Sequence, residues 1–383
     1  MTETGNFDLT ASSMGAVDKN LSEVISSFFR GKLDLVDWKQ KDPEWAKHKR
    51  EQTRKLWFSV AEDLGYNPYE TTNLKAVSRV GRHRKFWYGE MKGKEGSIQI
   101  SKKHCRSLAE YLKTIGHELY HFFGARFDSD CDWRVGICYP VTDAEGRFFG
   151  TFSSLNEGVV EKESARKLYE FSKEGKIAAV KSHPGPECYH YEVLLVDQIC
   201  RALCCSNSEF YPTPTEAFKL FENASFGISA EDRDKPNNQK YLKKWQLAIK
   251  RAFGGEGALK KLARKIDNLE KAPKNKKKEM WNELIEFISV PIVKSGVIER
   301  LSEEDLYLLG EGEKVIGFIN KDELENKEID TEKGKQEIKK RIYEKLKSDE
   351  GTPYSSAYWL WAVDPETGLP NIDKVAVVGV KKN

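Results

Sequence analysis

Residues 113–124 hold the side chains whose types and spacing point most directly to chemistry. They contain His117, Glu118 and His121 in the pattern H-E-x-x-H. On a helix, two histidines four residues apart project from the same face one turn above each other, so both imidazoles can reach one Zn²⁺ ion. The glutamate between them can hold a water molecule bound to that ion. The pattern therefore predicts a metal site that activates water for hydrolysis.

The residues around the motif predict the helix that it requires. Apolar residues recur there at helical spacing, and the two histidines lie nearly opposite the centre of this stripe, which consists of Leu108, Leu112, Ile115, Leu119 and Phe122. We expect the helix to bury its apolar side and to turn the histidines toward a cleft. Gly124 and the polar run 128–130 then predict its end.

A catalytic zinc site usually has three protein ligands and a water molecule. The next predicted helix begins near Ser153 and carries Glu157 in its first turns, with Glu161 one turn further along the same face. A glutamate alone does not indicate a metal site, and these two are candidates because they follow the H-E-x-x-H motif. Glu157 is therefore the candidate third ligand beside His117 and His121.

His117-Glu118-x-x-His121 followed by Glu157 resembles the gluzincin metallopeptidases, whose sites are thermolysin-like, and in particular the small soluble minigluzincins. The resemblance covers residues 75–260, and its specific motifs lie on the two metal-site helices. It implies a zincin-like catalytic domain in which His117, His121 and Glu157 bind Zn²⁺ and Glu118 is the general base. Thirty-five residues separate His121 from Glu157, more than in thermolysin-like enzymes, and an inserted hairpin would absorb the excess.

The same resemblance implies roles for residues next to the ligands. Asn156 and Glu161 would contact the ligands from behind, and Glu161 stands where the family usually has an aspartate that accepts a hydrogen bond from a ligand histidine. The family often uses a tyrosine or histidine downstream of the third ligand to stabilise the oxyanion. Tyr191 is our candidate for this catalytic role, with Tyr189 and His190 as alternatives.

Residues 97–101 form a candidate substrate-binding strand. Polar Ser97, Gln99 and Ser101 alternate with apolar residues, as in a strand with one buried face, and the segment leads directly into the metal-site helix. An open strand at this position can receive an extended peptide by strand addition. The alternative is an ordinary interior or edge strand without a ligand.

The arrangement of helical and extended patterns predicts an α+β fold. Short strands at 74–80, 85–91 and 97–101 predict a small mixed sheet with an edge strand packed on the active-site helix. A hairpin made of 133–139 and 147–152 is expected to follow. Helical patterns continue to about residue 262 as a helical lower half. We divide the chain into a flexible or helical segment (1–50), a zincin-like metallopeptidase domain (51–265) and a C-terminal α+β extension of unknown role (266–383).

Composition limits the partners and the compartment. The net charge of the 383 residues is only +3, so nothing calls for nucleic acid or a membrane as the main partner. The N-terminus lacks the features of a signal peptide, and no run approaches 18 apolar residues. Seven scattered cysteines do not form a disulfide framework. These features favour a cytoplasmic protein, and they do not indicate an oligomeric state.

The function that these features predict is zinc-dependent hydrolysis of peptide bonds, with a peptide or protein as the substrate. The main alternative is a protein that keeps the zincin fold for peptide binding or regulation without catalysis. Nucleic-acid association through the basic segments 47–55 and 271–278 is a third class. A metzincin site is disfavoured because Phe127 occupies the position of that family's third ligand.

Overall fold

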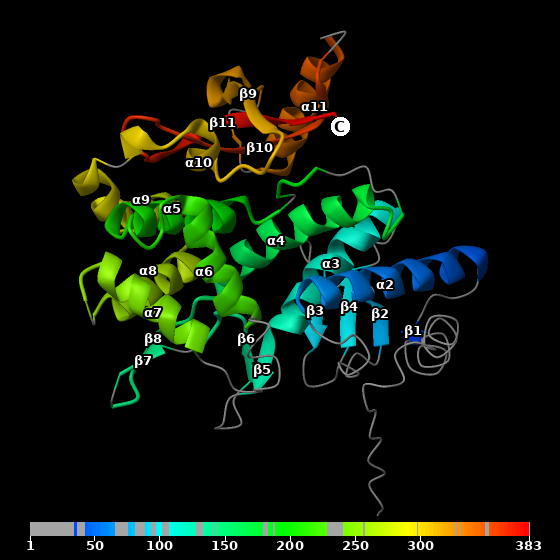
Figure 1. The fold of residues 1–383 in the computed structure, drawn as a ribbon, viewed down its shortest axis with the longest axis horizontal. Coiled ribbons are helices and arrows are strands. Elements are labelled where there is room, and N and C mark those ends of the chain that lie inside the picture. Colours follow the sequence, from blue (N-terminus) through cyan, green and yellow to red (C-terminus); the bar gives the residue numbers. More distant parts are fainter. Residues whose placement is uncertain are drawn as a thin grey trace, which may run out of the picture.

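Most of the described chain is helical, which follows from the apolar residues that recur every three to four positions. The ten α-helices of the described residues have the following bounds: α2 Pro43–Asp63, α3 Leu108–Gly124, α4 Ser153–Lys173, α5 His190–Ser206, α6 Pro214–Phe226, α7 Lys240–Ala252, α8 Ala258–Lys271, α9 Lys277–Ser295, α10 Glu303–Tyr307 and α11 Glu332–Ser348. Short 3₁₀ turns include η4, Lys274–Lys276. Together with small sheets, these helices form the predicted α+β fold (Figure 1).

The strands are short except near the C-terminus. Their bounds are β1 Asp34–Val36, β2 Ala76–Val80, β3 Gly89–Lys92, β4 Ser97–Ser101, β5 Ala125–Phe127, β6 Trp133–Val135, β7 Val141–Thr142, β8 Phe148–Gly150, β9 Glu313–Asn320, β10 Tyr354–Val363 and β11 Pro370–Lys381. The computed structural model describes residues 34–36, 43–65, 76–80, 89–92, 97–101, 107–127, 133–139, 141–143, 145–178, 183–186, 188–227, 240–255, 257–296, 298–325, 328–329, 331–348 and 352–382.

The first sheet is mixed and supports the metal-site helix. Its strand order is β1-β2-β4-β3, with β2 parallel to β4 and β3 antiparallel to it. Ile98 and Ile100 are fully buried, and α3 packs against both β3 and β4. Helix α2 packs along α3 and helps to bury it (Figure 1). The predicted strand 97–101 is therefore confirmed, and this sheet fixes the position of α3.

The prediction that a peptide adds to the strand carrying Ser97, Gln99 and Ser101 is wrong. Strand β4 is an interior strand whose backbone is paired with β2 on one side and with β3 on the other. No edge is left on it for strand addition. Among the described strands, β1 and β3 are the two edge strands of this sheet, and β3 is the edge strand that packs against α3.

The hairpin predicted from 133–139 and 147–152 is also wrong in its pairing. Strand β6 pairs with β5, which directly continues α3, and β8 pairs with β7. Two small hairpins therefore occupy the connection between α3 and α4. The Asp143 carboxylate closes the second turn by accepting hydrogen bonds from the backbone N–H groups of Glu145 and Arg147.

The C-terminal residues share a core with the helices before them. Helix α9 packs along α5, and residue 265, our predicted domain boundary, falls inside α8. The buried Arg201 side chain on α5 donates to the carbonyl oxygen of Leu306 at 2.8 Å, and Gln198 donates to that of Gly368 at 3.2 Å. The antiparallel sheet β10-β11-β9 therefore sits on the helical part as one packed unit (Figure 1).

Strands β9, β10 and β11 are the β part of the C-terminal α+β extension. Among the residues that the structure describes, no helix has the length and apolar composition needed to cross a membrane.

Candidate metal centre

Helices α3 and α4 bring three ligand atoms together. Glu157 Oε2 lies 3.1 Å from His117 Nε2 and 3.2 Å from His121 Nε2, and the two Nε2 atoms are 3.1 Å apart. These separations are short enough for all three atoms to reach one ion at the bond lengths of about 2.0–2.2 Å that zinc makes with nitrogen and oxygen ligands. The two histidines are buried and Glu157 is largely covered. The geometry therefore fits one metal ion.

The hydrogen-bonding roles of these atoms also call for a cation. Glu161 Oε2 lies 3.0 Å from His117 Nδ1, and a carboxylate only accepts, so Nδ1 carries the hydrogen. In a neutral imidazole, Nε2 is then an acceptor, and it faces the Glu157 carboxylate, which is an acceptor too. Like lone pairs repel unless a positive charge lies between them. The site can hold a metal ion or, without one, a proton.

The electrostatics agree with this interpretation. Burial by itself lowers the pKa of His117, but hydrogen bonds and charge from Glu157 and Glu161 outweigh it and raise that pKa well above its ordinary value. Burial by itself raises the pKa of Glu157, but the charge and hydrogen bonds of the two histidines lower it well below its ordinary value. The site therefore favours an ionised carboxylate beside positive charge.

The predicted residues behind the ligands are in contact with them. Glu161 accepts from His117, and the Asn156 carboxamide lies 3.2 Å from His121 Nδ1 while its oxygen accepts from the Ile137 backbone N–H. Gly136, with φ +56°, adjoins this amide, and a Cβ atom there would collide with Asn156 Oδ1. The turn at Gly136 thus holds Asn156, and Asn156 fixes the His121 ring.

A close approach between α4 and α5 positions the remaining site residues. A Cβ atom at Gly158 would collide with the carbonyl oxygen of Glu192, so only glycine lets the start of α5 lie directly against α4 beside Glu157. The residue before α5 is Tyr189, whose φ of 51° is in the left-handed region. This turn carries Tyr189 out of the helical path and toward the metal centre.

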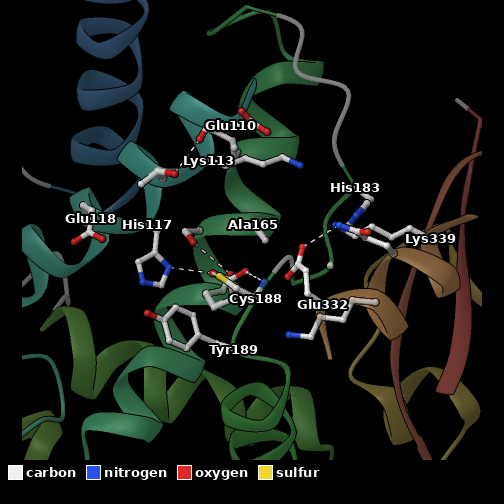
Figure 2. A pocket seen from close by; sticks show the side chains of 17 residues that line it. Glu110, Lys113, His117, Glu118, Ala165, His183, Cys188, Tyr189, Glu332 and Lys339 are labelled. Carbon is white, nitrogen blue, oxygen red and sulfur yellow. Dashed lines mark hydrogen bonds and ion pairs between the residues drawn. The ribbon is translucent and has the colours of Figure 1, made fainter. Parts of the chain in front are cut away.

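Tyr189, and not Tyr191, lies at the metal centre. The Tyr189 ring stacks on His117 with centroids 5.4 Å apart, and its neighbour Cys188 donates to Glu161 through both its backbone N–H and its thiol (Figure 2). Tyr191 instead packs between Trp281 and Trp361, away from the ligands. Of the two tyrosines considered for the oxyanion, Tyr189 is therefore the one beside a metal-site histidine, and Tyr191 is not.

The other alternative, His190, packs against the C-terminal sheet, and its contacts show how that sheet reaches the site. His190 stacks on Trp359 with centroids 3.7 Å apart, and His183 stacks on Tyr358 at 5.3 Å. A Cβ atom at Gly185 would collide with the Tyr358 ring, so this loop lies flat on β10. Aromatic side chains of β10 therefore hold both ends of the segment that carries Tyr189.

A pocket opens beside the ligands. Its volume is about 270 Å³, and it is lined by His117, Glu118 and Tyr189 on one side and by α11 residues, including Glu332 and Lys339, on the other (Figure 2). The Glu118 carboxylate is buried next to the metal-site histidine. Such a cavity can bring a substrate carbonyl group to the centre with little water around it.

Burial and the carboxylates around it, Glu157 first among them, raise the pKa of Tyr189. The phenol therefore keeps its proton and can donate a hydrogen bond. No signal in the sequence separated Tyr189 from Tyr191, since both lie at the start of one helical pattern. Cys188 and the α11 lining were not predicted, because their contacts join segments far apart in the sequence.

The chain gives no match with protein-family models, with curated proteins or with solved structures. The interpretation of the site therefore rests on the residues themselves. Two histidines and one glutamate, with ligand atoms within 4.8 Å of one another, form a triad that could hold a metal ion, at the three positions that the sequence predicts.

Proposed function

We propose that this protein is a zinc-dependent peptide hydrolase with a gluzincin-type site in a zincin-like domain. One observation carries the proposal: His117, His121 and Glu157 converge from α3 and α4 while Glu118 and Tyr189 line the adjoining pocket. Two imidazoles and one carboxylate suit Zn²⁺. When bound, Zn²⁺ polarises a carbonyl group and lowers the pKa of water to about 7.

The protein's own groups would do the proton transfers. Glu118 takes the proton of the attacking water molecule and later gives it to the leaving amine. Tyr189 donates a hydrogen bond to the oxygen that becomes negative as water attacks the carbonyl carbon. Glu161 and Asn156 keep the two imidazoles oriented, because each holds an Nδ1 atom.

A peptide library tests this proposal. The purified full-length protein, loaded with one equivalent of Zn²⁺, should cleave a subset of peptides that mass spectrometry identifies, and a zinc chelator should stop cleavage reversibly. A protein that binds one zinc ion and retains peptides on a column without cleaving any would instead be the non-catalytic peptide-binding alternative.

We expect Tyr189→Phe to lower kcat by about 10²-fold or more, because one hydrogen bond to the developing oxyanion is lost. The dependence of kcat on pH below neutral pH should not change, and neither should the zinc content, since the ring still stacks on His117. Steady-state kinetics on the best library peptide measure the effect. Tyr191→Phe is the matched control, and a loss in that variant as large as in Tyr189→Phe would contradict our assignment.

We also expect Trp359→Ala to lower kcat by up to about 10²-fold with zinc content unchanged, because the segment that presents Tyr189 loses its support. Trp359→Phe keeps a stacking partner for His190 and should restore most of the rate. Phe318→Ala, on β9 of the same sheet and 41% exposed, is the control for the sheet itself. Equal losses in Phe318→Ala and Trp359→Ala would mean general destabilisation instead of positioning.

A further inference from the structure

One part of this chain is enriched in basic residues. Residues 240–278 contain fourteen lysines and arginines and only three acidic residues, whereas the net charge of the whole chain is +3. The rest of the chain therefore carries a net negative charge. The low net charge of the chain is thus the sum of a strongly positive segment and a negative remainder. Such an uneven distribution of charge is typical of a protein with a surface that binds a polyanion.

The fold turns this segment into a positive surface. Helices α7 and α8 bury their apolar faces, with Trp245 and Leu262 fully covered, so their basic residues remain on the outer faces. The two helices pack against each other, and α8 also packs on β7 and β8. Figure 1 shows α8 and β8 on the side of the helical part away from the C-terminal sheet.

Cations and aromatic rings are interleaved along one stripe of this surface. Lys260 and Arg264 lie over the Phe149 ring at 5.3 and 4.8 Å from its centroid, and Lys271 lies 5.8 Å from the centroid of Phe148. Phe148 is 54% exposed, unusually high for a phenylalanine. We name these five residues the α8–β8 stripe.

One of the three cations of the stripe is paired with a carboxylate, and other acidic side chains around it contact other groups. Glu270 accepts hydrogen bonds from Ser153 and Ser154, and Asp143 and Glu145 both accept from Arg147. Asp267 pairs with Lys271 at 2.7 Å, while Lys260 and Arg264 each lie over a ring. The positive charge of the stripe therefore comes mainly from Lys260 and Arg264, while Lys271 shares its charge with Asp267.

The spacing of the stripe fits the backbone of a nucleic acid. Residues 260 and 271 lie eleven positions apart on one helix, about 16 Å along its axis. That length spans roughly two to three phosphates of an extended strand. An exposed ring can stack only on a base that is not paired, and stacking on aromatic side chains between cations is how sequence-independent single-strand binders work.

We propose that the α8–β8 stripe binds single-stranded nucleic acid, with Lys260, Arg264 and Lys271 on the phosphates and Phe148 under a base. A bilayer is the less suitable partner, because Phe148 is the one large, strongly exposed apolar side chain of the stripe. The proposal is independent of the metal centre and of peptide hydrolysis.

Fluorescence anisotropy with labelled 20-nucleotide DNA and RNA strands tests the proposal on the full-length protein. The triple variant Lys260→Gln, Arg264→Gln, Lys271→Gln should weaken binding at least tenfold and make the slope of log Kd against log salt shallower by about 2. Phe148→Ala should weaken binding by about tenfold and leave that salt slope unchanged.

Matched controls come from α11, where Lys333, Lys340 and Lys347 are exposed and Tyr343 is 57% exposed with Lys347 over its ring. Neutralising these three lysines, or Tyr343→Ala, should leave binding unchanged. The proposal is overturned if both triple variants weaken binding equally, if Phe148→Ala has no effect, or if anionic phosphatidylserine vesicles bind where the strands do not. Circular dichroism confirms that each variant is folded.

Discussion

Exchanging Glu118 for glutamine should leave zinc bound and lower kcat for peptide cleavage by about 10²–10⁴-fold. Glutamine has nearly the same shape as glutamate but cannot accept a proton at neutral pH, so the attacking water keeps its proton. The ligands His117, His121 and Glu157 are untouched, and the buried position can hold the amide in the same orientation. Steady-state kinetics and elemental analysis of the same preparation measure the two quantities.

Glu110→Gln is the matched control for this variant. Glu110 lies on the same helix and lines the same pocket, but it is exposed and accepts the backbone N–H of Ser107 at the start of α3. Its exchange should change kcat by less than about threefold, since general-base catalysis does not pass through it. Full activity in Glu118→Gln would show that Glu118 is not the general base, and the proposed mechanism would then be wrong.

The part of the site that sequence predicts best is the part encoded locally. His117, Glu118 and His121 lie within about 1.1 turns of a helix, so their spacing fixes their mutual geometry once the helix forms. Asn156, Glu157 and Glu161 form a second local set on α4. That the two sets face each other does not follow from helical periodicity, and the resemblance to gluzincins supplied it.

The errors have a common physical cause, which is that pairing between distant segments leaves no periodic signal. A strand such as 97–101 alternates in the same way whether its neighbours lie on one side or on both. The left-handed turn at Tyr189 lies outside the helical period, and its support by Trp359 spans 170 residues. Burial and contacts across the chain therefore decide which of several adjacent aromatic residues reaches the ligands.

The C-terminal part illustrates the same limit for function. Its sequence contains no chemical motif, yet α11 lines the pocket beside Glu118 and β10 holds the segment of Tyr189. Residues without chemistry of their own can thus determine how Tyr189 is placed beside His117. The division of the chain at residue 265 separates elements that build one site.

Removing the third ligand should have the largest effect on metal binding. We expect Glu157→Ala to lower zinc affinity by more than the roughly 10–100-fold that loss of a residue behind a ligand costs, because two imidazoles then face a cavity without a carboxylate. Competition with a chromophoric chelator measures the affinity. Thermal unfolding gives a second readout, since zinc bound only by the native state raises the Tm of the wild type and should not raise that of the variant.

Two variants on the same helix calibrate this experiment. Glu161→Gln keeps a partner for His117 Nδ1 but loses the charge, so its zinc affinity should fall between those of the wild type and Glu157→Ala. Glu170→Ala, which removes a surface carboxylate paired with Lys167, should bind zinc like the wild type. Wild-type zinc affinity in Glu157→Ala would show that the ion is held elsewhere, and the hydrolase proposal would fail with it, because Glu118 would have no metal beside it.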